Sequence, residues 1–596
     1  MSDHDPSRPA ASVPAWVAAL DPAEAVLRSA VDGDQLLSGM WPEDRPGLPL
    51  EAAQECLLEC LAGLLPEPPA VLLVSGWGLG APAAWLAGRG YRVLGVNGSP
   101  GRVAYAQQRF AGPRVAFAAS WAADGEAVGT DDAVLALEPG AASGALDRVV
   151  ERAAGVLAPQ GRLVLAARTA RLPSAAGRLP GATEVAVMAA EAGFVVLERL
   201  ELGEAVAPTA ERWLARLESR RRQVEGLLGA DGQKWVEEVA GRLRQRAAAA
   251  AAGDEGYTVW SCRRDEIRLR SYREGDEHRI LPVFEGLFFH RRSLEHWAWK
   301  YRDHPLGALR IAVANAPNGD LAAHYAAYPV CFRSTVPELA DCESMQVGDT
   351  MTHPAYRRTG LGPTGLLSRL VHYYYDRFCL GKVPFIYGFN TGKIRAIGER
   401  YLGYEYLQEV ELASAPAGRL RRSLGRRLGD RLRGWWVGRV RTVGPEHDRL
   451  LEEVAPAYGF LVRRDSTWIR WRYLELPDQE VELFEVRRRG ELVGWAVFRR
   501  DEGTLRWGDA LFRPDLPEAT AILLDRVVRD HEEVARVVGW LAPHPPWWVG
   551  RLEALGFVRA PEPNGLAPTF KVFDPAYGVA ALGRSLYFTE GDSDLF

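Results

Sequence analysis

The chain has few cysteines and no recognisable metal-binding motif. Its six cysteines in 596 residues are scattered, and Cys56 and Cys60 stand four positions apart with no second pair at metal-ligand spacing. Eleven histidines form no His-Glu-x-x-His or comparable cluster. This pattern excludes a disulfide framework and a standard zinc motif. We expect reduced thiols, a cytoplasmic protein and no bound metal.

The sequence also lacks a strong net charge and a long apolar run. The formal net charge is -5, so nothing attracts the whole chain to nucleic acid, and we expect no nucleic-acid partner. No apolar stretch approaches the roughly 20 residues of a membrane span. The start, MSDHDPSRPAASVP, has neither the basic beginning nor the apolar middle of a signal peptide. The length predicts three or four soluble domains, but nothing indicates an oligomeric state.

The first third alternates short apolar strands with helical patterns. Strands are expected at residues 70–75, 91–96, 133–137 and 163–167, with helices between them. Such alternation predicts a doubly wound parallel sheet. A glycine turn, SGWGLG, follows the first strand, which is the nucleotide-binding side of these sheets.

This region resembles the class I SAM-dependent methyltransferases. The segments LLVSGWGLG, YRVLGVNGSPGRVAYAQQRF, DDAVLALEP and AGVLAPQGRLVLAAR match their glycine turn and their second, fourth and fifth strands. The resemblance implies a Rossmann-like domain over residues 1–264, with a helical insertion at about 207–252. Val74 and Asn97 replace two acidic residues of the family pattern, and losing a charged acceptor weakens hydrogen bonds to the ribose. The residues implied for SAM are Gly76, Gly78, Gly80 and Asn97.

The middle of the chain contains HPAYRRTGLG, residues 353–362, between a strand pattern and a helical pattern. Glycines let backbone approach a ligand, and the free amides of a helix start favour an anion. Arg357 and Arg358 add positive charge. The motif resembles the acyl-CoA-binding motif Q/R-x-x-G-x-G/A of GNAT-superfamily acetyltransferases, with Arg357, Gly360 and Gly362 at its defining positions. Downstream, FIYGF, Asn390, a helix and Leu-Gly-Tyr follow in the family order.

The resemblance implies a GNAT domain at 265–412 that transfers an acetyl group from acetyl-CoA to an amine. The backbone near Thr350 would pair with pantetheine, and the turn would hold the diphosphate. Residues implied for acetyl-CoA are Thr350, Met351, Arg357, Arg358, Thr359, Gly360, Leu361, Gly362 and Asn390.

Four residues are candidates for moving protons in that reaction. Glu343 and Asp349, on the strand before the motif, are candidate general bases. The position of the family's acidic tyrosine holds Glu399, and Tyr401 lies two residues nearer the Leu-Gly-Tyr turn. Glu399, Tyr401 and water therefore remain open as the proton donor to the thiolate.

The last third repeats the middle. Trp299-x-Tyr301-x-x-x-Pro305 recurs as Trp471-x-Tyr473-x-x-x-Pro477, which indicates an internal duplication. The second copy, residues 444–580, also resembles GNAT, but its cradle position reads RPDLPE. Without the glycine pair we expect a structural domain that shapes the acceptor site.

Two further segments complete the expected organisation. Residues 413–443 are predicted to be a basic linker, and the leucines and arginines of 418–441 are also those of an amphipathic helix that contacts a membrane peripherally. Residues 581–596 are predicted to be an acidic tail, of which Glu590–Phe596 is expected to be disordered.

The sequence therefore predicts an α/β protein with a Rossmann-like methyltransferase sheet followed by two GNAT-like mixed α/β domains. The main hypothesis is an N-acetyltransferase acting on a small-molecule amine, such as an amino sugar or a natural-product intermediate. One alternative is a bifunctional SAM-dependent methyltransferase and acetyltransferase. The other is a non-catalytic assembly protein built from relic nucleotide-binding folds.

Overall fold

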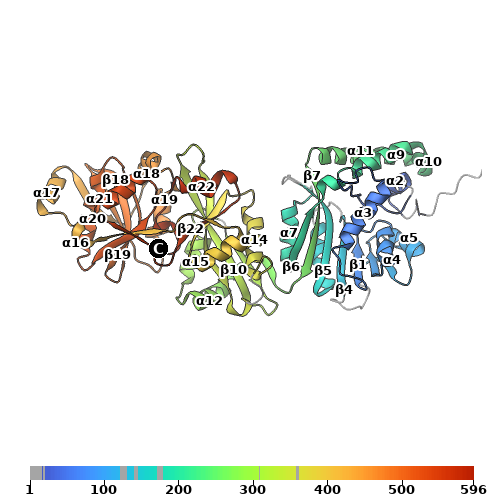
Figure 1. Cartoon of the computed structure of the whole chain (residues 1–596), viewed down its shortest axis with the longest axis horizontal. Coiled ribbons are helices and arrows are strands. Elements are labelled where there is room, and N and C mark those ends of the chain that lie inside the picture. The colour runs from blue at the N-terminus through green and yellow to red at the C-terminus, as the bar shows by residue number, and fades with distance from the viewer. Residues whose placement is uncertain are drawn as a thin grey trace, which may run out of the picture. The chain divides into compact units, whose positions relative to one another are not determined.

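The computed structural model describes residues 16–17, 20–31, 33–120, 131–139, 145–170, 179–307, 309–357 and 362–596, with Lys393 described by its backbone alone. The chain is an α/β protein of two compact units, the N-terminal unit, Met1–Leu269, and the C-terminal unit, Arg270–Phe596 (Figure 1). The sequence placed this boundary at 264/265. None of the described helices has the length and apolar character needed to cross a bilayer.

The N-terminal unit contains a seven-stranded sheet in the order β3-β2-β1-β4-β5-β7-β6. β1 to β5 pair in parallel, whereas β7 runs antiparallel to both β5 and β6. The expected doubly wound sheet is confirmed. Its strands are β1 Val71–Ser75, β2 Arg92–Val96, β3 Val115–Ala118, β4 Asp131–Leu137, β5 Leu157–Ala170, β6 Phe194–Glu201 and β7 Glu255–Arg264.

Helices cover this sheet, and a separate helical layer lies at one end of it. In that layer α11 packs against α2 and α9 through Trp213, Leu217 and Val236, which are buried (Figure 1). This helical layer includes the helical insertion predicted at about residues 207–252. The helices are α2 Pro22–Val31, α3 Leu50–Ala62, α4 Ala81–Gly88, α5 Pro100–Phe110, α6 Ala145–Val156, α7 Ala182–Glu191, α8 Gly203–Val206, α9 Thr209–Ser219, α10 Arg221–Leu227 and α11 Gly232–Ala251, with a 3₁₀ turn η1 Gly229–Asp231.

The C-terminal unit contains two mixed sheets. The middle sheet has the order β13-β22-β12-β11-β10-β16-β23, with β9 also on β10 and β8 on β9. The C-terminal sheet has the order β15-β17-β18-β19-β20-β14-β21. The strands are β8 Arg268–Ser271, β9 Arg310–Asn315, β10 Leu321–Ser334, β11 Cys342–Thr352, β12 Phe385–Asn390, β13 Glu405–Tyr406, β14 Glu411–Pro416, β15 Trp435–Val440, β16 Phe460–Val462, β17 Glu482–Arg488, β18 Glu491–Asp501, β19 Thr504–Phe512, β20 Arg536–Leu541, β21 Val558–Pro561, β22 Ala567–Val572 and β23 Leu586–Tyr587.

Helices of the C-terminal unit are shorter, and four of them pass into single π-helical turns. The α-helices are α12 Glu277–Phe288, α13 Leu294–Trp297, α14 Leu366–Tyr374, α15 Gly392–Ile397, α16 Ala417–Leu420, α17 Leu424–Leu432, α18 Pro445–Tyr458, α19 Ser466–Ile469, α20 Pro517–Asp530, α21 Pro546–Ala554 and α22 Val579–Gly583. The π turns are η2 Ala298–Arg302, η4 Tyr375–Cys379, η5 Gly398–Leu402 and η6 Arg470–Leu474, and 3₁₀ turns are η3 Pro354–Tyr356, η7 Pro575–Tyr577 and η8 Glu590–Asp592.

The two sheets of the C-terminal unit exchange a strand. β14 comes before the second copy in sequence, yet it pairs with β20 and β21 of the C-terminal sheet. β22 falls within the second copy, yet it pairs with β12 and β13 of the middle sheet. The predicted division at 413–443 therefore does not separate the sheets, and β15 within that segment is itself a strand. One continuous core spans both sheets.

The repeated Trp-x-Tyr segments face each other. The rings of Trp299 and Trp471 stack at a centroid distance of 4.8 Å. Each indole donates a hydrogen bond to the main-chain oxygen of the other tryptophan, at 2.8 and 3.1 Å. Both lie in a π turn, η2 or η6. The predicted duplication thus appears as a pair of equivalent, mutually bonded elements.

The acidic tail is ordered, so the prediction of disorder was wrong. β23 pairs with β16, and Glu590, Asp592 and Phe596 are each at most 2% exposed. Its carboxylates meet basic partners, Glu590 with Arg506 and Asp592 with Arg464. The fold brings basic residues from distant parts of the sequence next to these acids, and the resulting ion pairs stabilise the tail. The composition of the tail alone does not show these partners.

Candidate functional site

A cavity of about 720 Å³ opens in the middle sheet where β11 and β12 part. The two strands pair in parallel at Met345–Ile386 and Gln346–Tyr387. Beyond these pairs, residues 347–350 of β11 and 388–390 of β12 line the cavity. Asp349 has φ 53°, and the β10–β11 register shifts beside it. A bulge of this kind bends its strand, which accounts for the parting of β11 from β12.

Asp349 is the charged centre of one cavity wall. Its carboxylate accepts hydrogen bonds from the Tyr301 hydroxyl at 2.7 Å and the Lys300 ammonium at 3.3 Å, and it pairs with Arg292. Burial alone would raise the pKa of Asp349, but Arg292 and Lys300 outweigh it and hold that pKa well below its usual range. Asp349 is thus an ionised carboxylate fixed by three partners, and it is poorly suited to accept a proton.

The ordered tail supplies a second carboxylate to the cavity. The Asp594 Oδ2 lies 3.4 Å from the Lys300 Nζ, and its side chain is 24% exposed. The neighbouring Phe596 also lines the cavity, and Arg472 donates a hydrogen bond to its main-chain oxygen at 2.9 Å. Asp594 is therefore more accessible and less bonded than Asp349.

Aromatic and basic side chains also line the cavity. The His296 ring packs edge-on against Trp299 at a centroid distance of 5.2 Å. Burial, followed by the nearby charges of Arg292 and Lys300, lowers the pKa of His296 to about 4. A neutral imidazole, an indole and the guanidinium of Arg472 therefore border the same space.

A buried tyrosine lines the cavity at its other side. The Tyr404 hydroxyl lies 2.7 Å from the Tyr325 hydroxyl, and burial raises the pKa of Tyr404 to about 12. This phenol stays protonated near neutral pH and can donate a hydrogen bond. Of the two proton-donor candidates from the sequence, Glu399 is exposed and Tyr401 half-buried, and both lie outside the cavity lining.

The residues expected around acetyl-CoA divide into three groups. Thr350 and Asn390 line the cavity, whereas Met351 is buried in the core beside it. Arg357 is exposed and donates a hydrogen bond to the Thr352 main-chain oxygen at 3.3 Å. Gly362 has φ 146° and precedes α14. The rest of the predicted cradle lies outside the described residues, namely Arg358, Thr359, Gly360 and Leu361.

Glu343, the other candidate base, is on the same strand as Asp349 but away from the cavity lining. Its side chain is 42% exposed and pairs with Arg310 at 2.6 Å. The geometry makes this a surface ion pair.

The equivalent opening in the C-terminal sheet is filled by the tail. Asp509 takes the place of Asp349, accepting hydrogen bonds from Arg464 at 2.9 Å and from Tyr473 at 2.7 Å. A Cβ on Gly508 would lie 2.0 Å from the Phe596 ring, and one on Gly591 would lie 2.1 Å from the Tyr473 hydroxyl. The cavity beside Asp509 measures about 20 Å³, against about 720 Å³ in the middle sheet. The second copy therefore has no comparable room for a ligand at this place.

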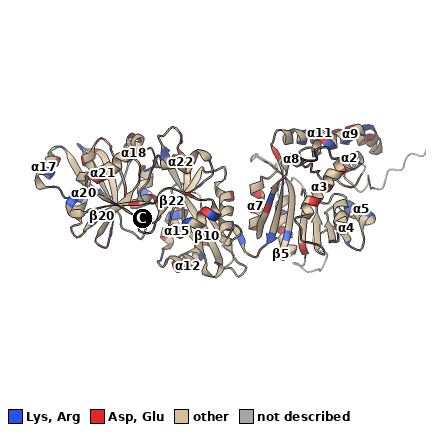
Figure 2. Ribbon diagram, in the orientation of Figure 1, with Lys and Arg blue, Asp and Glu red and all other residues tan. Residues whose placement is uncertain are grey.

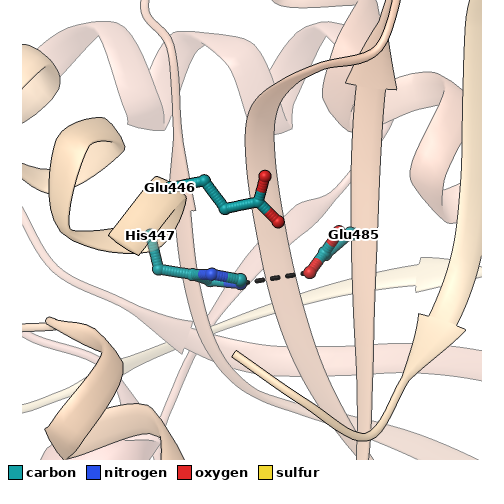
Figure 3. Close-up of side chains that lie close together, drawn as sticks. All are labelled: Glu446, His447 and Glu485. Atoms are coloured by element: carbon teal, nitrogen blue, oxygen red, sulfur yellow. Dashed lines mark ion pairs between the residues drawn. The ribbon is translucent and has the colours of Figure 1, made fainter. Parts of the chain in front are cut away.

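One group of three described side chains has metal-ligand chemistry, Glu446, His447 and Glu485 (Figure 3). The His447 Nδ1 accepts a hydrogen bond from the Gly444 amide at 3.3 Å, so its Nε2 carries the proton in the neutral ring and faces Glu485 at 3.2 Å. Arg487 bonds both carboxylates. The three side chains and Arg487 form an ion-pair network, in which the buried His447 Nε2 has no hydrogen-bond partner among the described residues.

The glycine turn of the N-terminal unit has the conformation that glycine favours. Gly76, Gly78 and Gly80 have φ of 78°, 61° and 107°, and a Cβ on Gly76 would lie 1.8 Å from the Leu137 oxygen. Val74, at a position acidic in the methyltransferase pattern, is fully buried. The Asn97 Oδ1 accepts the Ser99 amide at 2.9 Å, and no described residue accepts a hydrogen bond from its amide nitrogen.

A polar cluster closes the carboxyl end of this sheet. Glu138, just after β4, accepts hydrogen bonds from the Ser38 amide and the Tyr257 hydroxyl, both at 3.1 Å. Arg246 of α11 donates to the Ser38 hydroxyl at 3.0 Å and pairs with Glu255 at 3.2 Å. The helical layer is thus tied to the sheet edge where the glycine turn lies.

Comparisons with known proteins agree with part of this description. Residues 73–165 match the model of a family described as a methyltransferase domain. No curated protein matches the chain. Similar solved structures include the cyclopropane synthase MmaA2 from Mycobacterium tuberculosis, with 19% identity, 44% of this chain and 100% of that chain covered, and a TM-score of 0.36. The mycolic acid cyclopropane synthase CmaA1 complexed with SAH and CTAB has 20% identity, coverages of 44% and 100%, and a TM-score of 0.37. A conserved protein from Enterococcus faecalis, described as a probable N-acyltransferase, has 13% identity, coverages of 52% and 73%, and a TM-score of 0.39.

Several cavity residues were missed by the sequence analysis. Asp594 was assigned to a disordered tail, and Lys300 and Tyr404 lay within recognised motifs without an assigned role. Arg292 and Arg464 each stand seven residues before the repeated Trp. This shared position was a usable signal, because a repeated basic residue in a buried motif requires an acidic partner in each copy. That partner, Asp349 or Asp509, is distant in sequence.

Proposed function

We propose that the protein is a bifunctional transferase, with methyl transfer in the N-terminal unit and acyl transfer in the C-terminal unit. The methyltransferase match over residues 73–165 favours this alternative over an acetyltransferase with an inactive neighbour. The parting of β11 from β12 around a cavity of about 720 Å³ is the observation that supports acyl transfer.

In the acyl-transfer proposal, the thioester of acetyl-CoA enters between β11 and β12. Residues 357–362 would hold the diphosphate, and Thr350 and Asn390 already lie at the cavity. The acceptor is a small-molecule amine, which enters beside Trp299 and Arg472. A site with polar groups at a few fixed points in an aromatic wall is typical of small-molecule pockets.

The reaction forms one bond and breaks one. The amine nitrogen attacks the carbonyl carbon, a C–N bond forms, and the C–S bond breaks to release a thiolate. The ammonium form must first lose one proton to a base. After the attack the nitrogen loses a second proton to give the amide, and the thiolate gains one. We assign to Tyr404 the role of donating a hydrogen bond to the departing sulfur, because its phenol stays protonated.

Asp594 is the carboxylate that best suits the role of base. The described carboxylates at the cavity are Asp349, Asp478 and Asp594. Asp349 is fixed by three partners, and Asp478 accepts a hydrogen bond from Ser293 at the rim. Asp594→Asn should lower kcat by roughly 100-fold with little change in the KM for acetyl-CoA. Asp478→Asn is the matched control, and an equal loss in both variants would remove Asp594 from this role.

In the methyl-transfer proposal, SAM lies against the turn of Gly76, Gly78 and Gly80. Asn97 at the end of β2 would meet the ribose hydroxyls with an amide in place of a carboxylate. A charge-assisted hydrogen bond is stronger, so Asn97→Asp should tighten SAM binding by roughly tenfold.

Melting temperatures test both halves in one experiment. A ligand held by the folded state raises the melting temperature by mass action. We expect one shift with acetyl-CoA and another with SAM or its demethylated product, with the SAM shift larger in Asn97→Asp. A shift with acetyl-CoA alone would leave an acetyltransferase with an inactive methyltransferase-like unit. No shift with any ligand would favour a non-catalytic assembly protein.

A further inference from the structure

Helix α17 turns its leucines to solvent. Leu424, Leu428 and Leu432 stand at every fourth position and are 64%, 53% and 89% exposed. The buried residue of this helix is Asp430. A helix on the surface of a globular protein normally buries its apolar stripe and exposes its charges. α17 has the opposite arrangement.

Ion pairs fix that orientation. Asp430 accepts hydrogen bonds from Arg422 at 3.1 Å and from Arg433 at 2.6 Å. The Arg422 amide in turn donates to Asp525 of α20 at 2.7 Å. Rotating the leucines inward would pull Asp430 away from these partners. The apolar stripe is therefore held outward by the fold.

An exposed tryptophan lies on the strand that α17 contacts. Trp436 follows α17 on β15, the edge strand of the C-terminal sheet, and is 50% exposed. α17 contacts β15. Tryptophan is enriched where proteins meet the membrane–water interface, because its ring is apolar and its N–H polar.

Arginines border one side of the stripe. Arg421, Arg426 and Arg431 are exposed and form no ion pair with any residue that the structure describes. Figure 2 shows the basic residues on α17. At 100° per residue, Arg427 and Arg431 stand beside the leucine stripe, whereas Arg426 stands opposite it, on the side of Asp430. Their long side chains can keep the charge at headgroup level while the leucines go deeper.

We propose that α17 and Trp436 form a docking surface for an anionic lipid bilayer, with the leucines in the acyl boundary and the arginines at the headgroups. The unpaired arginines supply the charge complementarity, and the outward leucines supply the apolar insertion. A nucleic-acid surface would use the arginines but leave the leucines in water. A bilayer offers anionic headgroups to the arginines and an apolar interior to the leucines.

Co-sedimentation of the full chain with vesicles tests the proposal. We expect binding to phosphatidylglycerol–phosphatidylcholine vesicles at low salt and much weaker binding to phosphatidylcholine alone. Replacing Arg427 and Arg431 by Gln should lower the vesicle partition coefficient by about 25-fold, since each basic residue near an anionic surface contributes a factor of about five. Leu424→Gln/Leu428→Gln/Leu432→Gln should lower it about tenfold or more.

Matched controls separate insertion from general surface effects. Leu306, Leu380 and Val558 are 43%, 44% and 66% exposed elsewhere, so Gln at these positions should leave vesicle binding unchanged. Every variant should keep the wild-type melting temperature. Absent vesicle binding, binding undiminished in the leucine variant, or salt-sensitive binding to duplex DNA in place of vesicles would each overturn the proposal.

Discussion

A single aspartate shows how differently one residue appears in a sequence and in a structure. Asp349 was a candidate base because it precedes the predicted cradle. In the fold, its carboxylate is bonded by Arg292, Lys300 and Tyr301, and its φ is 53°. The second copy repeats this arrangement with Asp509, Arg464 and Tyr473. A feature shared by an open and a filled site indicates a structural role.

Asp349→Asn should therefore destabilise the C-terminal unit. The substitution leaves Arg292 buried without its counter-charge and Lys300 with Asp594 as its one remaining acidic partner among the described residues, which costs about 3–5 kcal/mol of unfolding free energy. Urea denaturation of the variant measures this. Glu343→Gln, on the exposed part of the same strand, is the control and should change the unfolding free energy by less than about 1 kcal/mol. Normal stability with lost acetyl transfer in Asp349→Asn would instead make this residue the base.

His296 should make the unfolding free energy of the C-terminal unit depend on pH. The pKa of His296 is lowered to about 4 in the folded state, so the unfolded chain takes up a proton at higher pH than the folded chain. Stability linked to this group is complete above about pH 6.5 and is lost as the pH falls toward 4. Between pH 7 and pH 4.5, the unfolding free energy of wild type should fall by roughly 1–2 kcal/mol more than that of His296→Asn. Urea denaturation at both pH values measures the two decreases. His278→Asn, with a side chain 69% exposed, should lose as much as wild type. Equal losses in all three proteins would contradict the account.

At the scale of elements, periodicity located the strands well but could not assign them to sheets. The strand predicted at residues 70–75 is β1, Val71–Ser75, and the expected FIYGF strand is β12. The exchange of β14 and β22 was not predictable, because alternation of apolar residues shows that a strand has a buried face without showing its partner. The tail was wrongly predicted because acidic composition resembles disorder until Arg464, Arg506 and Lys300 are placed beside it.

The tail should contribute strongly to the stability of the C-terminal unit. Phe596 is 2% exposed and lies against Gly508. Phe596→Ala should lower the unfolding free energy by about 3–5 kcal/mol, because it leaves a hole in packed structure. The adjacent Leu595 is 50% exposed, so Leu595→Ala should lower it by less than about 1 kcal/mol. Equal stability of the two variants would show that the tail does not hold the second opening closed.

At the scale of the whole molecule, the α/β class and the Rossmann-like sheet followed from sequence alone. The cavity did not, because its walls come from β11, β12, η2, η6 and the tail, which are far apart in the chain. The two openings differ in what occupies them. One copy keeps a cavity of about 720 Å³, and the other receives the tail that also borders this cavity.

The central claim is that acyl-CoA occupies the space between β11 and β12. Calorimetric titration of acetyl-CoA into the full chain and into Gly388→Phe tests it directly. A Cβ on Gly388 would lie 3.5 Å from the Val347 oxygen, an ordinary contact, so the strand tolerates a side chain that enters the cavity. Gly550→Phe, where a Cβ meets open space on α21, is the control. The account predicts binding by wild type and Gly550→Phe and its loss in Gly388→Phe, and undiminished binding in Gly388→Phe would contradict it.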